Sequence, residues 1–144
     1  MRSIRIVLVD DHEIARRALR SVLNSNPKLE IVGEAAEGKE AVKKVGELRP
    51  DIVLLDISLP DISGIEAAPQ MRAISPESRI IFVSQHTSSS LAEDALRGGA
   101  YGYVVKSDAG LDLLTAIDEA HQGRTFISRT LQRRGPKENP TANQ

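Results

Sequence analysis

Short apolar runs alternate along the chain with longer stretches whose apolar residues recur at helical spacing. The apolar runs cover residues 4–9, 29–32, 52–55, 80–83 and 101–105, and they are rich in valine and isoleucine. Continuous apolar runs of this length are typical of strands that are buried on both faces of a parallel sheet. The pattern therefore predicts five buried strands.

The stretches between these strands place apolar residues on one side of a helix. The predicted faces are Ile14, Ala18, Leu19, Val22 and Leu23; Ala41, Val42, Val45 and Leu48; Leu91, Ala95 and Leu96; and Leu111, Leu114, Ile117 and His121. Strands that alternate with helices imply a doubly wound sheet with right-handed crossovers. We expect an α/β fold: a flavodoxin-like, five-stranded parallel sheet of order 2-1-3-4-5 with five helices.

The third helix is expected from about Ile65, but Pro69 interrupts it in "GIEAAPQMR". A proline inside a helix loses a backbone hydrogen bond, at a cost of about 3 kcal/mol. We therefore expect this helix to be kinked or to start late.

Polar residues and glycines mark the ends of other helices. Asp10 or Asp11 can cap the first helix, and Asp108 can cap the last one. Gly98 and Gly99 are expected to stop the fourth helix.

The apolar pattern stops near Phe126. Residues 1–124 are expected to form one folded domain, and residues 125–144 a flexible tail or the start of an interdomain linker. The basic residues of this end are expected to be solvated rather than bound to phosphate; they are Arg129, Arg133, Arg134 and Lys137.

Composition narrows the classes of function. The net charge of −1 provides no overall field that attracts nucleic acid, and an aromatic content of 3% argues against a base-stacking surface. The absence of cysteine excludes disulfides and thiolate metal sites. No apolar run approaches the roughly 20 residues of a membrane span, and the N-terminus lacks a signal-peptide pattern. We expect a cytoplasmic protein that does not enter a membrane.

The candidate chemistry lies at the carboxyl ends of the predicted strands, where open parallel sheets bind ligands. The polar residues at those ends are Asp10, Asp11, Asp56, Ser84 and Lys106. The expected strand order places the first and third strands side by side, so three carboxylates converge. Such a cluster is costly unless a cation neutralises it or a proton is taken up. With oxygen ligands and no cysteine, Mg²⁺ is the expected cation.

Asp56 ends the buried run in "DIVLLDISLPDISG". A buried strand holds this carboxylate at a rigid edge, where it can act as a nucleophile that forms an aspartyl-phosphate. Phosphoryl transfer requires mostly positioning and charge neutralisation, which Mg²⁺ and Lys106 can provide. Ser84 can donate a hydrogen bond to a phosphoryl oxygen.

These residues, in this order and spacing, resemble the response-regulator receiver domain of two-component signalling. Asp10-Asp11, Asp56 with "LPDISG", Ser84 in "IIFVSQH" and Lys106 in "GGAYGYVVK" carry the resemblance, which covers roughly residues 4 to 123. The details "ALRGGAYGYVVK" and "SQH" are similar to receivers of the NarL/FixJ type.

The resemblance implies a role for each matched position. Asp56 is the phosphoacceptor and a metal ligand, Asp11 binds Mg²⁺ directly, and Asp10 binds it largely through water. The backbone carbonyl of Ser58 is a further metal ligand. Ser84 and Tyr103 are the switch residues, and Lys106 holds a phosphoryl oxygen. His86 and His121 are not expected to be ligands.

The resemblance also implies the partners. A sensor histidine kinase donates the phosphoryl group, and the receiver switches conformation to control an output. The protein is therefore not expected to be an enzyme beyond phosphotransfer and autodephosphorylation. The output is expected to be transcription regulation, with DNA contacted only through a domain outside this sequence, and a homodimer is possible. Gln85 departs from the smaller residue of many relatives and can crowd the phosphoryl group.

Several alternatives stay open at this point. The chain can be a stand-alone receiver, or an interaction module that works without phosphorylation. A Mg²⁺-dependent phosphatase with an aspartyl nucleophile would need a D-x-D motif, whereas Asp10 and Asp11 are adjacent. A flavin-binding module would need a phosphate loop after the first strand, where "DDHEI" repels phosphate.

Overall fold

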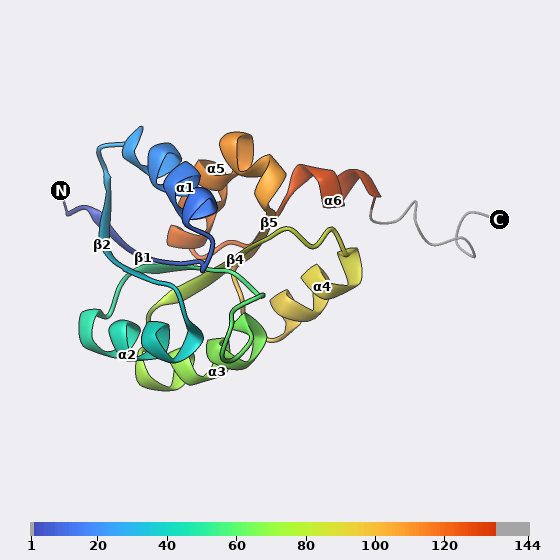
Figure 1. Ribbon diagram of the computed structural model, residues 1–144. Helices are drawn as coiled ribbons and strands as arrows, with labels where there is room; N and C mark the ends of the chain where they lie inside the picture. The colour runs from blue at the N-terminus through green and yellow to red at the C-terminus, as the bar shows by residue number, and fades with distance from the viewer. Residues whose placement is uncertain (1, 135–144) are drawn as a thin grey trace.

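A computed structural model describes residues 2–134 of the protein. Strands and helices alternate along this part of the chain (Figure 1). No helix within it is both long and apolar enough to cross a membrane. The elements are β1 (Ile4–Val9), α1 (Glu13–Asn24), β2 (Leu29–Ala35), α2 (Gly38–Leu48), β3 (Ile52–Leu55), α3 (Gly64–Ile74), β4 (Arg79–Ser84), α4 (Ser89–Arg97), β5 (Gly102–Val105), the 3-10 helix η1 (Lys106–Asp108), α5 (Ala109–His121), β6 (Phe126–Ile127) and α6 (Arg129–Arg134).

All strands run parallel, in the order β2-β1-β3-β4-β5-β6. Helices α1 and α5 cover one face of the sheet, and α2, α3 and α4 cover the other (Figure 1). Alternate residues of a strand therefore enter different apolar layers: Ile6 and Leu8 pack under α1 and α5, while Val7 and Val9 pack under the opposite helices. Burial on both faces explains why the strands read as continuous apolar runs. The expected flavodoxin-like fold and the order of its first five strands are confirmed.

The sixth strand and α6 are additions to the predicted fold. The sequence predicts a tail from residue 125, but Phe126 N donates to Tyr101 O at 3.0 Å and Ser128 N donates to Tyr103 O at 2.9 Å. Leu131 of α6 is 2% exposed. Two strand residues and one turn of apolar spacing are too short to give a periodic signal. The rest of the predicted tail, residues 135–144, lies outside the described residues.

The predicted apolar faces of α1 and α5 are partly wrong. Leu19 and Leu23 are buried as expected, but Ile14 is 84% exposed. On α5, Leu111 is 68% exposed and His121 is also exposed, while Leu113 is buried. The buried face of α5 is narrow and built largely of alanines, which sequence spacing did not distinguish from the large apolar residues beside them: Ala109, Leu113, Ala116, Ile117 and Ala120.

Helix α3 is assigned continuously through Pro69, so the expected late start is wrong. A capping box begins the helix: Ser63 Oγ accepts from Glu66 N, and Glu66 Oε1 accepts from Ser63 N, both at 3.1 Å. The proline removes the hydrogen bond to the carbonyl of Ile65. Both Ile65 and Pro69 are exposed, so water can bind that carbonyl instead.

The predicted helix ends are right in one case and wrong in two. Gly98 is the C-cap of α4, and Gly99 follows with a φ of 112°, a conformation that glycine adopts without strain. His12, not Asp10 or Asp11, is at the N-cap of α1, without a side-chain cap bond. Asp108 is at the N-cap of α5, but its side chain does not cap that helix.

Two residues fix the loop between β3 and α3. A Cβ atom at Gly64 would lie 2.2 Å from the backbone oxygen of Asp56, so only glycine fits there. Asp61 accepts from Gly38 N at 2.7 Å and from Lys39 N at 2.9 Å, and these backbone bonds lower the pKa of Asp61 to about 2. The loop that follows Asp56 is thus held against α2 and α3.

Candidate phosphoacceptor and metal site

Asp10 and Asp56 lie next to each other at the carboxyl edge of the sheet. Their strands are paired, with Val9 opposite Leu55, so each aspartate follows directly after a paired residue. Asp56 N donates to Val9 O at 3.0 Å, which fixes the two strand ends relative to each other. The side chains are buried: Asp10 is 1% exposed and Asp56 is 2% exposed.

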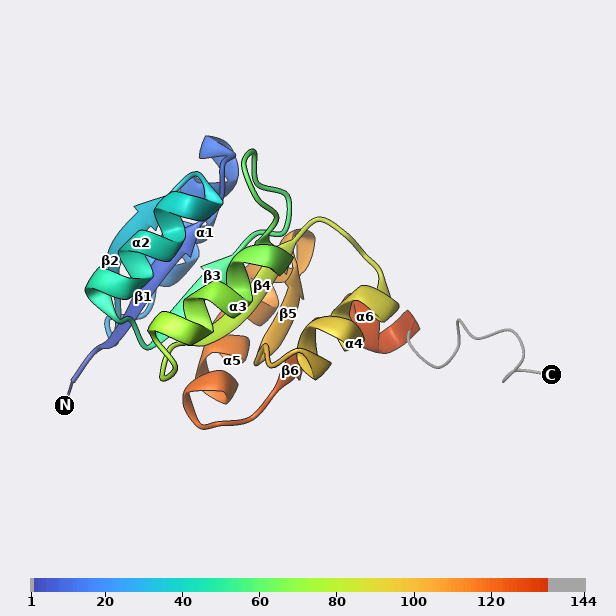
Figure 2. The same cartoon turned by 90° about the horizontal axis from the view of Figure 1, so that it is seen from below.

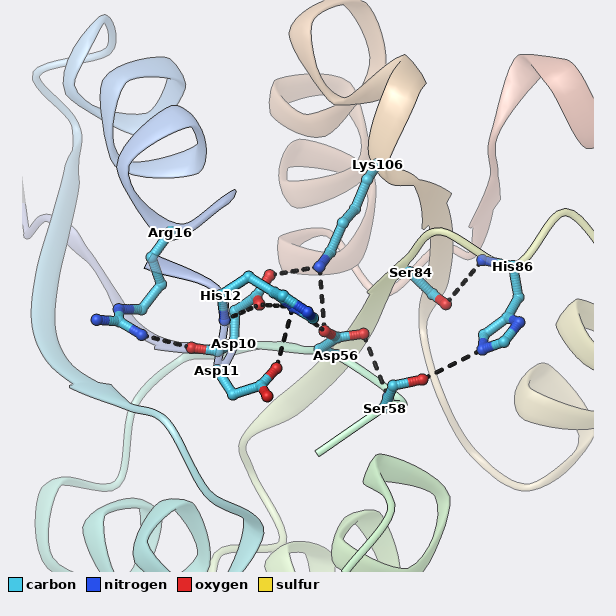
Figure 3. Close-up of polar contacts among 9 residues, drawn as sticks. All are labelled: Asp10, Asp11, His12, Arg16, Asp56, Ser58, Ser84, His86 and Lys106. Carbon is cyan, nitrogen blue, oxygen red and sulfur yellow. Dashed lines mark hydrogen bonds and ion pairs between the residues drawn. The ribbon is translucent and has the colours of Figure 1, made fainter. Parts of the chain in front are cut away.

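Lys106 lies between these two carboxylates (Figure 3). Its Nζ is 2.7 Å from Asp10 Oδ2 and 3.0 Å from Asp56 Oδ2. The lysine begins η1 directly after β5, so it reaches across the end of β4 to the acids of β1 and β3. One ammonium thus faces two buried carboxylates, which leaves the group with a net negative charge.

Asp11 and His12 complete the cluster on its open side. One ligand atom from each of Asp10, Asp11, His12 and Asp56 lies within 4.8 Å of the others. His12 Nδ1 is 3.0 Å from Asp11 Oδ1 and 3.2 Å from Asp10 Oδ1. His12 is not among the predicted site residues, because a histidine after two aspartates is typical of the first residue of a helix.

The buried charges shift the pKa values of the two central groups. Burial raises the pKa of Asp56 above its usual range, although the hydrogen bond from Lys106 opposes the shift. Burial lowers the pKa of Lys106, but the hydrogen bonds to Asp10 and Asp56 outweigh it and leave the pKa raised. The ammonium therefore stays charged, and Asp56 holds its negative charge at an energetic cost.

Arg16 is a second residue of the site that the sequence did not reveal. Its Nη1 donates to the backbone oxygen of Asp10 at 2.7 Å (Figure 3). Nε of the same guanidinium is 3.3 Å from Glu34 Oε1. Arg16 thus fixes the backbone turn on which the acidic pair is carried. An arginine on an amphipathic helix gives no sequence signal for such a contact.

His86 connects the loop after β3 to the end of β4. Its Nε2 lies 3.2 Å from Ser58 Oγ, and its backbone N donates to Ser84 Oγ at 3.1 Å (Figure 3). Ser58 N in turn donates to Asp56 Oδ1 at 3.3 Å. Ser84 is fully buried at the edge where Asp56 ends the neighbouring strand.

Tyr103 lies beneath this connection. Its ring is fully buried, with its centroid 6.4 Å from that of Phe82, and its hydroxyl donates to His86 O at 3.0 Å. Burial raises the pKa of Tyr103. The two residues expected to switch, Ser84 and Tyr103, are therefore both bonded to the backbone of His86.

The donor set fits a small divalent cation. It consists of carboxylate oxygens, with one imidazole nitrogen beside them and no sulfur. Hard oxygen donors of this kind favour Mg²⁺. The excess of negative charge around a single ammonium is the condition under which a cation is stabilised.

Comparison with known proteins identifies the family of the chain. The sequence matches the response regulator receiver domain family over residues 6–118. The chain belongs to the response-regulator receiver family, and within that fold its acids, lysine and serine lie at the expected edge.

One of its relatives is a transcriptional activator. The chain is 39% identical over 124 residues to the DNA-binding transcriptional activator DevR/DosR of Mycobacterium tuberculosis, covering 86% of this chain and 57% of that protein. It is 32% identical over 125 residues to the response regulator protein VraR of Staphylococcus aureus, covering 87% of this chain and 60% of that protein. The chain thus spans somewhat more than half the length of these relatives.

A solved structure shares nearly the whole described fold. The two-component response regulator of the LuxR family from Aurantimonas sp. SI85-9A1 is 36% identical, with a TM-score of 0.88, and the match covers 96% of this chain and 99% of that one. This coverage means that the similarity extends past α5 to the β6–α6 end of the chain.

Proposed function

We propose that Asp56 accepts a phosphoryl group from a phosphohistidine of a sensor kinase. In this reaction the N–P bond of the donor breaks, and a bond forms between phosphorus and a carboxylate oxygen of Asp56. The product is an acyl phosphate, and the histidine nitrogen leaves with the electron pair. The observation that carries the proposal is the convergence of Asp10, Asp56 and Lys106 within hydrogen-bonding distance.

The other members of the site have supporting roles in this proposal. Asp11, Asp56 and the carbonyl of Ser58 would hold Mg²⁺ directly, and Asp10 would hold it through water. A bound ion would supply positive charge that neutralises the phosphoryl group. Lys106 holds a phosphoryl oxygen, since its Nζ already lies 3.0 Å from the acceptor carboxylate. Hydrolysis of the acyl phosphate would return the site to its starting state.

Phosphorylation is proposed to act on Ser84 and Tyr103. The new oxygens offer Ser84 a stronger, charged acceptor, so its hydroxyl turns toward Asp56. The Tyr103 side chain then moves into the space that the Ser84 side chain leaves. The modification can shift an existing equilibrium only by the difference in its interaction with the two states.

The surface beside the site suits a helical partner such as the kinase. Ile14 on α1 and Leu111 on α5 are 84% and 68% exposed. Between these helices a hollow of about 290 Å³ is lined by Ala15, Ala18, Leu19, Val22, Lys106, Ala109 and Gly110. Exposed apolar side chains around a hollow favour docking of an apolar helix or of a second copy of the chain.

The output is proposed to be control of transcription, through a DNA-binding domain such as that of the activator named among the relatives. The receiver is proposed to work in the cytoplasm and to have no catalytic role beyond phosphotransfer and autodephosphorylation. Residues 1–124 are proposed as the receiver unit. An isolated receiver that binds a partner without phosphorylation is the second candidate, and the experiment below separates the two.

The test is phosphoryl uptake from acetyl phosphate, followed by intact-mass spectrometry. We expect the wild type to gain one acid-labile phosphoryl group with Mg²⁺ and at least 100-fold less with EDTA. Asp56→Asn should not gain it. Asp51→Asn is the matched control, because Asp51 precedes the same strand at its opposite end. Uptake by Asp56→Asn contradicts the acceptor assignment, and no uptake by the wild type favours the phosphorylation-independent module.

A further inference from the structure

The end of the described chain is bound to β5, the strand that carries the switch residue Tyr103. Strand β6 pairs with β5, with Phe126 opposite Gly102 and Ile127 opposite Tyr103. Ser128 N donates to Tyr103 O at 2.9 Å, and Ser128 is fully buried. Tyr103 therefore contacts His86, beside the phosphorylation site, through its hydroxyl and the C-terminal segment through its backbone.

Two carboxylates hold the segment at the start of α6. Asp112 Oδ2 accepts from Arg129 N at 2.9 Å, and Asp112 Oδ1 accepts from Arg129 Nε at 2.8 Å. Asp108 accepts from Ser128 Oγ, from Thr130 N at 3.1 Å and from Thr130 Oγ1 at 2.8 Å. We name Asp108 and Asp112, with Ser128, Arg129 and Thr130, the carboxylate clasp. Asp112 is 2% exposed, so its charge depends on these donors.

An apolar contact completes the attachment. Leu131 of α6 is 2% exposed and belongs to the same apolar cluster as Ala92 and Ala95 of α4 and Tyr103 of β5. Helix α6 accordingly lies beside α4 at the edge of the sheet (Figure 2). A helix of six residues is not stable alone in water, so α6 depends on this packing and on the clasp.

The clasp begins two residues after the lysine of the phosphorylation site. Lys106 and Asp108 are the ends of one 3-10 turn, so a displacement of one moves the other. Tyr103 connects to the segment separately, through its backbone and through the cluster that contains Leu131. Two residues of the phosphorylation site are therefore joined to the segment: Lys106 through Asp108, and Tyr103 through its backbone.

We propose that the carboxylate clasp is the output latch of this receiver, and that phosphorylation of Asp56 loosens it. This inference rests on the proposed function of Asp56. Loosening frees α6 from α4 and exposes Leu131 together with the surface of α4 that it covers. The movement of α6 is the signal that passes from the receiver to its output.

The direction follows from hydrogen-bond geometry. In the described state the clasp bonds from Arg129 and Thr130 are 2.8 to 3.1 Å long, which is near the optimum. Lys106 follows the new phosphoryl oxygens, and Tyr103 changes its packing when Ser84 turns. Either motion displaces η1 or β5 relative to β6 and α6, and a displacement from optimal geometry weakens the bonds.

The test measures hydrogen–deuterium exchange of the amides in residues 126–132. In the phosphorylated wild type we expect these amides to exchange about tenfold faster, while the amides of α1 keep their rates. Asp112→Asn should produce the same increase without phosphorylation, with unchanged phosphoryl uptake. Arg129→Gln opens the clasp from the other side and serves as a second variant if Asp112→Asn folds poorly. Asp118→Asn is the matched control, because Asp118 is an exposed aspartate of the same helix.

The outcomes separate this inference from the function on which it rests. Full uptake of phosphate on Asp56 without faster exchange in residues 126–132 overturns the latch and leaves the acceptor assignment intact. Absence of uptake overturns the acceptor and the coupling together. In that case the exchange rates of Asp112→Asn still test whether Asp112 holds the segment. If residues 126–132 exchange at the same rate in Asp112→Asn and in Asp118→Asn, the clasp is overturned as well.

Discussion

Two pairs of aspartates lie at the same edge of the sheet, and their surroundings differ. Asp10 and Asp56 share a single ammonium, that of Lys106. Asp112 instead receives an N–H and a guanidinium from Arg129, and Asp108 receives donors from Ser128 and Thr130. Asp10, Asp56 and Asp112 are each at most 2% exposed. The backbone N–H groups of His12 and Ser58 also donate to Asp10 and Asp56. The difference lies in the cations: Asp10 and Asp56 share one ammonium, whereas Asp112 binds the guanidinium of Arg129.

The difference separates a site that can accept charge from one that holds structure. A buried carboxylate that binds a guanidinium of its own is stabilised in its charged form, and the pair ties together the segments that carry the two groups. Two carboxylates that share one cation keep unmet demand for positive charge, which a metal ion can meet. Substitutions that remove one charge at a time test this contrast between the two pairs of aspartates.

The largest effect is expected when the shared cation is removed. Lys106→Met leaves Asp10 and Asp56 buried together without a positive charge, which should lower the free energy of unfolding by roughly 3 kcal/mol at pH 7. The loss should shrink as the pH falls, because the raised pKa of Asp56 rises further and its protonation relieves the repulsion.

Urea unfolding followed by circular dichroism measures this effect. Lys43→Met, an exposed lysine of α2, is the control and should change stability little. Addition of Mg²⁺ should restore part of the loss in Lys106→Met. An equal loss in both variants would show that the ammonium does not compensate the acids.

A smaller loss is expected at the clasp. Asp112→Asn removes the charge that Arg129 binds and turns one acceptor into a donor that faces the Arg129 donors. We expect a loss of roughly 2 kcal/mol, measured by urea unfolding. A loss that appears in the exchange of α6 but not in global unfolding would place the clasp outside the cooperative core.

The same substitution at Asp56 should change the free energy of unfolding in the opposite direction. Asp56→Asn removes a charge whose burial is costly, while Lys106 keeps Asp10 as its partner, so stability should rise by roughly 1 kcal/mol at pH 7. The pKa of Asp56 is raised in the folded state, so this cost is absent below its unfolded pKa. The gain should therefore disappear as the pH falls through the folded pKa toward about 4. A loss of stability at pH 7 would contradict the contrast between the pairs.

The smallest effect on stability is expected from His86→Ala. The imidazole bonds to the hydroxyl of Ser58, and its removal should change the free energy of unfolding by less than about 0.5 kcal/mol. Mg²⁺ affinity should fall a few-fold, because the loop with the Ser58 carbonyl loses a support. Calorimetric titration measures this fall, with the exposed His121→Ala as the control. Equal Mg²⁺ affinity in both variants would exclude a positioning role for His86.

The sheet, most of its strand order and the group of residues at its carboxyl edge could be predicted from the sequence. Strands buried on both faces must be continuously apolar, and polar residues that end such strands must gather at one edge. For this reason Asp10, Asp11, Asp56 and Lys106 could be predicted to meet from residues far apart in the chain. The resemblance to receivers rests on the same residues.

The other features could not be predicted from the sequence, because they depend on contacts between segments that carry no pattern of their own. Pro69 fits inside α3 since its side of the helix faces solvent, and the alanine face of α5 follows from its close packing on the sheet. His12 and Arg16 reach Asp10 through the turn before α1. The attachment of β6 and α6 depends on donors that meet Asp108 and Asp112 only after folding, and a segment this short has no periodicity from which to predict it.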